Sequence, residues 1–184
     1  RRIQTSDEFR MINVKENFLP KNIFKQLHDK LFSETFSWYL AHDVVSYDAK
    51  WSATCEDIYN WQLIHNFYES PATFSQEINI MNSVMKIIDP RLLIRIKANL
   101  TPRADKIVEH GFHRDVEPPI PNATTSILYL NTNNGYTAFE DGTKVPSVAN
   151  TFVSFPSDMK HTGSTCTDIK FRGLINFNYI KGNV

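Results

Sequence analysis

Cysteine is scarce in this sequence, which contains only Cys55 and Cys166 among 184 residues. Neither belongs to a C-x-x-C pair, and two thiols are too few for a disulfide scaffold. The N-terminus also lacks the apolar core of a signal peptide. We therefore expect reduced thiols and a cytoplasmic location.

An excess of either charge is also missing. Lys+Arg and Asp+Glu both number 20, so the formal net charge is 0 at pH 7, and the pI is about 7.2. Nucleic-acid-binding proteins usually carry a basic excess, so nucleic acid is an unfavoured partner. No apolar run approaches the length that spans a bilayer, so we expect no membrane association.

Internal repeats and low-complexity segments are absent as well. The content of 41% apolar and 22% charged residues is typical of a globular protein. A chain of this length suits one domain with a sizeable core. We therefore predict a single domain over residues 1–184.

Two helices are predicted in the first half of the chain. The segment LPKNIFKQLHDKLFSE (19–34) has Pro20 in its first turn and one apolar face. The segment SPATFSQEINIMNSVMKIIDP (70–90) predicts a helix that opens at Ser70-Pro71 and stops at Asp89-Pro90. The predicted buried positions are Ile23, Phe24, Leu27 and Leu31 in the first helix and Ile78, Met81, Met85 and Ile88 in the second.

Between these helices lies an aromatic-rich stretch, residues 36–68, which contains Trp38, Trp51 and Trp61. Its periodicity is mixed, so we predict irregular structure with some strand. We expect this stretch and the loop at 100–112 to shape a substrate entrance.

The second half of the chain is rich in short β-type runs separated by turn signals. These runs are RLLIRIKANL (91–100), TTSILYLNT (124–132), TFVSFP (151–156) and KFRGLINFNYI (170–180). Helices followed by many short strands favour a mainly β, α+β protein, with helices packed on an antiparallel sandwich or barrel. The mouth of such a barrel is a typical ligand site.

Three of the six histidines have ordinary explanations. We expect His28 to lie at the surface or flank of the first helix. His42 and His65 fall in the aromatic stretch, where we expect hydrogen-bonded packing roles rather than metal binding.

The segment EHGFHRDVEP (109–118) contains the motif His113-x-Asp115. In a strand, residues two apart point to one face, so these two side chains converge, whereas His110 has the opposite parity and is a poor ligand. Arg114 points away from the ligands, which favours a substrate or surface role. By itself the motif is more typical of a polar turn than of a metal site.

His161 follows a later strand and changes that balance. Two histidines and a carboxylate on neighbouring strands can occupy one face of an octahedron, as in non-haem Fe(II) oxygenases. The same ligands also suit zinc. Downstream, Arg172 shares a strand face with Leu174, Asn176 and Asn178, opposite Phe171, Ile175, Phe177 and Tyr179. An inward arginine is costly unless it meets an anion, which is either a protein carboxylate or a ligand carboxylate.

The ordered set of HxD, a distal histidine and an arginine on the next strand resembles the Fe(II)- and 2-oxoglutarate-dependent oxygenases. TTSILYLNTNNGYTAFEDG (124–142) and VPSVANTFVSFPSDMKHTGSTCTDIKFRGLINF (145–177) resemble the prolyl-4-hydroxylase-like branch in particular. The resemblance implies a double-stranded β-helix (jelly-roll, cupin-like) core over about 91–182, supported by the helical and aromatic-rich part at 1–90.

The same resemblance implies the roles of the site residues. His113, Asp115 and His161 would bind Fe(II), and Arg172 would bind the distal carboxylate of 2-oxoglutarate. Tyr129 matches a family tyrosine that contacts this carboxylate, although a core aromatic is nearly as good an explanation. A second family tyrosine, on the strand before HxD, is replaced by Asn99. The implied cosubstrates are 2-oxoglutarate and O2, with ascorbate as an accessory reductant.

The resemblance further implies hydroxylation of an unactivated C–H bond with release of succinate and CO2. The expected substrate is a prolyl or other amino-acid side chain, in a peptide or protein or as a free amino acid. One alternative is a β-barrel that binds a metal or small acid without turnover. A weaker alternative is an AlkB-like nucleic-acid demethylase, because the second arginine of that family's pattern is absent.

Overall fold

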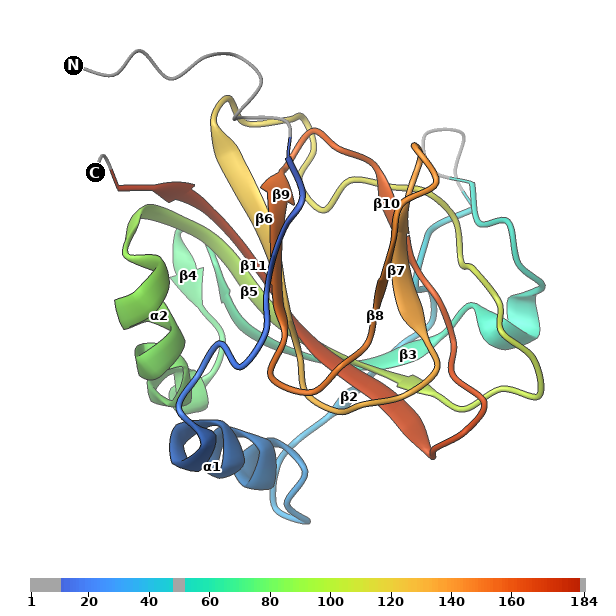
Figure 1. Cartoon of the computed structure of the whole chain (residues 1–184), viewed down its shortest axis with the longest axis horizontal. Helices are drawn as coiled ribbons and strands as arrows, with labels where there is room; N and C mark the ends of the chain where they lie inside the picture. Colours follow the sequence, from blue (N-terminus) through green and yellow to red (C-terminus); the bar gives the residue numbers. More distant parts are fainter. Residues whose placement is uncertain (1–10, 48–51, 183–184) are drawn as a thin grey trace.

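The computed structural model describes residues 11–47 and 52–182, and within them two β-sheets lie opposite each other (Figure 1). The strands of the major sheet, in order, are β1 (Asn13–Lys15), β9 (Phe152–Pro156), β6 (Ala123–Tyr129), β11 (Phe171–Lys181), β5 (Pro90–Pro102), β3 (Gln62–Glu69) and β2 (Tyr39–Ala41), with β4 (Ala72–Thr73) paired to β3. The minor sheet has the order β10 (His161–Gly163), β7 (Tyr136–Phe139) and β8 (Lys144–Pro146). Neighbouring strands in both sheets pair antiparallel.

The helices cover one face of the major sheet (Figure 1). They are α1 (Lys21–Leu31) and α2 (Asn82–Ile88), which the 3-10 helix η3 (Gln76–Met81) directly precedes, whereas the 3-10 helix η2 (Asp57–Tyr59) lies apart from them. Leu31 of α1 and Val84 of α2 are fully buried in one core with Phe177 of β11. Removing these apolar side chains from water stabilises the outer layer.

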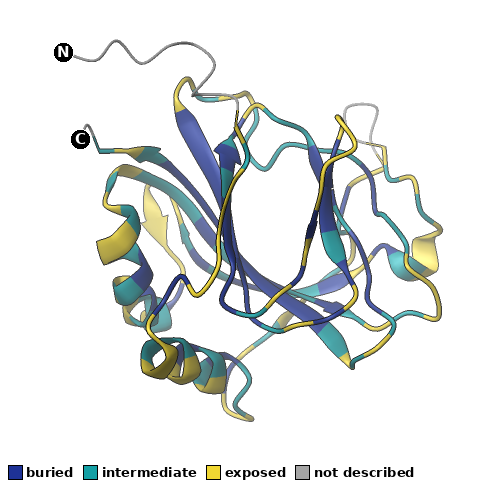
Figure 2. Ribbon diagram, viewed as in Figure 1, coloured by how far each residue is buried: buried dark blue, intermediate teal, exposed yellow. Residues whose placement is uncertain are grey.

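A second, smaller core lies between the two sheets. It contains Ile127, Tyr129, Phe139, Val145, Val153, Phe155 and Leu174. The major sheet is therefore covered on both faces, which explains the almost continuous burial of β6 and β11 (Figure 2). This two-sheet arrangement is the predicted double-stranded β-helix.

The predictions for the N-terminal half were partly confirmed. The first helix is present over Lys21–Leu31, directly after Pro20. The second predicted helix was only partly right, because residues 72–73 form a strand, Gln76–Met81 form a 3-10 helix, and the α-helix begins at Asn82. Ser75 caps the 3-10 helix by accepting a hydrogen bond from the Glu77 amide. Its end is as predicted, since Asp89 adopts a left-handed conformation that stops α2. Met81 is fully buried, and the other three predicted positions pack against the core.

The aromatic stretch contains more regular structure than its sequence indicates. Its last seven residues belong to β3, which continues to Glu69 and pairs with β5 inside the major sheet. Trp38 donates a hydrogen bond to the Leu31 carbonyl over 3.1 Å, and Trp61 remains 38% exposed. Trp51 lies outside the described residues. In the described part of the chain, no helix has the length and apolar character needed to cross a membrane.

Candidate active site

The HxD segment was predicted to be a strand, but it forms a single antiparallel bridge, in which His113 faces His161. The amide nitrogen of each histidine donates to the carbonyl oxygen of the other over 3.0 Å. His161 is the first residue of β10, so the bridge attaches the HxD segment to the edge of the minor sheet. The two imidazole rings lie side by side, with their centroids 4.9 Å apart.

Asp115 completes a cluster with these histidines. Its Oδ1 atom lies 3.8 Å from His113 Nε2 and 4.0 Å from His161 Nε2. One ligand atom from each of the three residues can be chosen so that all lie within 4.8 Å of one another. Two imidazoles and a carboxylate that converge on one point are a donor set for a divalent transition metal.

The protonation states also suit metal binding. Burial, followed by the positive charge that His161 can carry, lowers the pKa of His113 to about 4, and burial also lowers the pKa of His161. Both imidazoles are therefore neutral at pH 7 and keep a lone pair for a ligand bond. Burial by itself would raise the pKa of Asp115, but nearby positive charge, with Arg95 foremost, holds it well below its usual range.

Asp115 is held by a layer of side chains from β5 and β11. Arg95 Nη2 lies 3.1 Å from Asp115 Oδ1 as an ion pair. The side-chain amides of Asn176 and Asn178 donate to Asp115 Oδ2 over 3.2 Å and 3.4 Å. Such partners orient a carboxylate toward a metal. The sequence placed both asparagines on the inward face of β11 but gave them no role.

Arg172 lies in the same pocket, on β11. Its side chain is buried, with Nε donating to Ser147 Oγ over 2.6 Å and Nη2 to Thr137 Oγ1 over 3.0 Å. Thr137 Oγ1 also accepts from the Tyr129 hydroxyl over 2.8 Å, and the guanidinium lies over the Tyr129 ring. No carboxylate in the described part of the chain forms an ion pair with Arg172. A buried guanidinium without a carboxylate is a ready site for an anionic ligand.

Space for that ligand is left by a glycine. A Cβ built on Gly163 would lie 3.3 Å from Arg172 Nη1. Any larger side chain at this position would therefore crowd the part of the guanidinium that faces the pocket.

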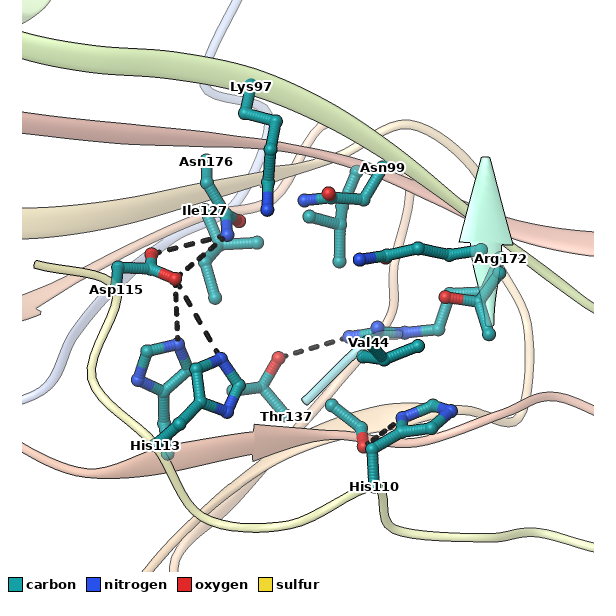
Figure 3. Close-up of a pocket in the computed structure, with 15 residues that line it drawn as sticks. Val44, Lys97, Asn99, His110, His113, Asp115, Ile127, Thr137, Arg172 and Asn176 are labelled. Atoms are coloured by element: carbon teal, nitrogen blue, oxygen red, sulfur yellow. Dashed lines mark hydrogen bonds and ion pairs between the residues drawn. The ribbon is translucent and has the colours of Figure 1, made fainter. Parts of the chain in front are cut away.

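One pocket connects the metal-ligand cluster to Arg172 (Figure 3). Its empty volume, which includes open solvent at the mouth, is about 500 Å³. Polar atoms without a hydrogen-bond partner face it, among them the buried Asn99 Oδ1 and Asn176 Oδ1. Buried polar groups are normally paired, so these atoms indicate room for a polar ligand.

Asn99 lines this pocket from β5, and so does Lys97, which was not among the predicted site residues. Lys97 lies two residues before Asn99 in the β-type run at 91–100, so the alternation of side chains along a strand could have placed both on the face that lines the pocket.

His110 is not part of the metal-ligand cluster, as predicted, but its position in the pocket was not predicted. His110 lines the pocket and is 1% exposed, with Nδ1 2.9 Å from the Gly163 carbonyl oxygen. The parity rule failed because Gly111 has a φ of 136°, which breaks the alternation of side chains.

The remaining histidines and Arg114 lie outside the pocket lining. His65 has the expected packing role, with hydrogen-bond contacts of 2.7 Å to the Ser37 carbonyl and to Ser75 Oγ. The packing role expected for His42 was wrong, because this side chain is exposed. His28 is half-buried on α1. Arg114 donates to the Asp158 carbonyl and to Glu117.

Solved structures with the same architecture have low sequence identity to this chain. A prolyl-4-hydroxylase from Pseudomonas putida aligns with a TM-score of 0.55 and 13% identity over 95% of each chain. A prolyl hydroxylase from Trichoplax adhaerens, in complex with a hypoxia-inducible factor peptide fragment, aligns with a TM-score of 0.56 and 11% identity over 92% of this chain and 83% of that one. This chain has the fold of the 2-oxoglutarate- and Fe(II)-dependent oxygenases.

The 2-oxoglutarate-oxygenase fold accommodates more than one reaction. The epimerase SnoN from nogalamycin biosynthesis, in complex with Fe3+, alpha-ketoglutarate and nogalamycin RO, aligns with a TM-score of 0.61 and 10% identity over 95% of this chain and 80% of that one. No protein-family model and no curated protein sequence matches this chain. Reaction and substrate must therefore be inferred from the site itself.

Proposed function

We propose that the protein is an Fe(II)- and 2-oxoglutarate-dependent dioxygenase that hydroxylates an unactivated C–H bond and releases succinate and CO2. The observation that carries this proposal is that a metal-ligand cluster and a buried arginine lie at opposite ends of one pocket. The cluster of His113, Asp115 and His161 lies at one end, and Arg172, without a carboxylate partner, lies at the other. A short dicarboxylate that reaches from a metal to a guanidinium would occupy both.

The chain's own residues would have distinct tasks in this reaction. His113, Asp115 and His161 would hold Fe(II), and the ion would supply a centre for O2 chemistry when bound. Arg172 would bind the distal carboxylate of 2-oxoglutarate with two parallel hydrogen bonds. Tyr129 would support Arg172 through Thr137, since its hydroxyl donates to Thr137 Oγ1 in the described structure. Asn99 Oδ1 would accept a hydrogen bond inside the pocket.

A prolyl or other amino-acid side chain, in a peptide or as a free amino acid, is the proposed substrate class. Two structural neighbours are prolyl hydroxylases, and one of them holds a peptide. Position 178 corresponds to the second arginine of the AlkB-like pattern. In this chain it is an asparagine that donates a hydrogen bond to Asp115, so this strand does not support a demethylase role.

The extent and setting of the enzyme are part of the same proposal. We propose one oxygenase domain over residues 1–184, in which the part before residue 90 supports the β-helix core. The cytoplasm is the proposed compartment, because both cysteines are unpaired. Ascorbate is a proposed accessory reductant.

Turnover of 2-oxoglutarate without added substrate tests the proposal. The wild-type protein with Fe(II), 2-oxoglutarate and O2 should release succinate slowly, and His161→Ala should reduce this rate by about 100-fold or more. The matched control is His28→Ala, which removes an imidazole from α1, outside the pocket lining. Retention of the wild-type rate in His161→Ala would refute the assignment of this ligand.

A further inference from the structure

Lys97 is the second cation that lines the pocket. Its side chain points from β5 into the cavity (Figure 3). No hydrogen bond or ion pair to its ammonium group is formed by any residue in ranges 11–47 and 52–182, and the charges that act on it, in decreasing order, are those of Arg95, Asp115 and Glu69. Burial, followed by the positive charge of Arg95, lowers the pKa of Lys97 to about 8, which still leaves it charged at pH 7. An inward ammonium without a partner is costly.

The register of β5 and β11 fixes the position of Lys97 along the pocket. Arg95 pairs with Asn178, Lys97 with Asn176, Asn99 with Leu174, and Thr101 with Arg172. Asn176 and Asn178 both contact Asp115, so the row that contains Lys97 lies at the metal-ligand end. Arg172 lies two rows farther, about 13 Å along the strands at the usual rise per residue.

The charges of the pocket leave Lys97 without a counter-ion even after the proposed cosubstrate is added. Asp115 is the one carboxylate among the lining residues, and it already forms an ion pair with Arg95. One carboxylate of 2-oxoglutarate would neutralise Arg172, and the other would meet the divalent metal. Lys97 therefore needs a third carboxylate, which neither the described protein residues nor the cosubstrate supplies.

We propose that Lys97 binds a carboxylate of the substrate, so the substrate carries an anionic group close to the carbon that is hydroxylated. This inference rests on the proposed function and narrows it. A free amino acid meets the requirement through its α-carboxylate, and a peptide meets it through an acidic side chain or its C-terminus. An internal prolyl residue between neutral neighbours does not meet it.

Anaerobic calorimetry on the protein loaded with Fe(II) and 2-oxoglutarate tests the proposal, because binding is then measured without turnover. Two ligand pairs differ only in charge: L-proline with L-prolinamide, and a short peptide that contains aspartate with its asparagine counterpart. At least one acid should bind about tenfold more tightly than its amide, and this preference should fall below about twofold in Lys97→Met. Lys97→Arg keeps the charge and should keep most of the preference.

Three results would overturn the proposal. The first is that neither acid binds the wild type more tightly than its amide, which includes the case in which no ligand binds. The second is that the preference for the acid survives in Lys97→Met. The third is that Lys97→Met weakens the binding of 2-oxoglutarate about tenfold, which would assign Lys97 to the cosubstrate. Failure of the wild type to bind Fe(II) or 2-oxoglutarate appears before any substrate is added. That failure identifies the proposed function itself as wrong.

Discussion

His113 and His161 are bridge partners, each donating its amide hydrogen to the other's carbonyl oxygen over 3.0 Å. Backbone pairing therefore sets the separation of two candidate metal ligands, whose ring centroids lie 4.9 Å apart. The third ligand, Asp115, lies two residues after His113 and is oriented by Arg95 and Asn176. The three donor groups are therefore held in place by backbone pairing and by neighbouring side chains before any metal binds.

Replacement of Arg172 should weaken 2-oxoglutarate binding. Lysine keeps the charge but loses the planar fork, so we expect Arg172→Lys to raise the KM for 2-oxoglutarate about tenfold and Arg172→Met about 100-fold. Succinate formation at increasing 2-oxoglutarate concentration measures both, and the thermal midpoint shows whether the variants fold. The matched control is Arg91→Met at an exposed position of β5. An unchanged KM in a folded Arg172→Met variant would mean that the distal carboxylate binds elsewhere.

A methyl group at position 163 should crowd the same guanidinium. The Cβ of Gly163→Ala would approach Arg172 Nη1 to 3.3 Å, while Arg172 is fixed by its bonds to Ser147 and Thr137. We expect the KM for 2-oxoglutarate to rise about tenfold with little change in the unfolding midpoint. If the variant binds 2-oxoglutarate like the wild type, the ligand does not approach Arg172 from the side of Gly163.

The stability of the metal-free protein should fall in mild acid. Burial, followed by the positive charge of Arg172, lowers the pKa of His110 from its ordinary value of 6.5 to about 4. The unfolded chain therefore binds more protons between these values, so the free energy of unfolding decreases as the pH falls from 6.5 toward 4. Above pH 6.5 the imidazole of His110 is neutral in both the folded and the unfolded chain, so its titration no longer changes the free energy of unfolding. The lowered pKa of His113 reduces the free energy of unfolding over the same pH range, from 6.5 toward 4.

His110→Gln isolates one part of this pH dependence, because glutamine does not titrate. Urea unfolding in the presence of a chelator, at several pH values from 4.5 to 7, should give a smaller loss of stability for this variant, by about 1–3 kcal/mol. A loss equal to that of the wild type would show that His110 does not stay neutral in the folded protein.

Much of the site was predictable because its chemistry is carried by rare residue types in a fixed order. An inward arginine on an alternating strand can be read from a period of two, and the observed β11 places Arg172, Leu174 and Asn176 along the pocket. The first helix was predictable for a similar reason, since its apolar residues recur at helical spacing.

Other features depend on information that local periodicity does not contain. Gly111 turns the chain between His110 and His113 with a positive φ, so a rule based on regular strands misplaced His110. β3 owes its regularity to pairing with β5, a partner about 30 residues away in sequence. Residues 72–75 leave the predicted helix to pair with and pack against β3.

Anaerobic absorption spectroscopy tests the central claim most directly. When Fe(II) and 2-oxoglutarate are added without O2, a weak visible charge-transfer band should appear in the wild type and saturate with 2-oxoglutarate. The band should be lost in His161→Ala and retained in His28→Ala. A silent wild-type spectrum at saturating concentrations of both reagents would contradict the account and favour a barrel that binds a metal or small acid without turnover.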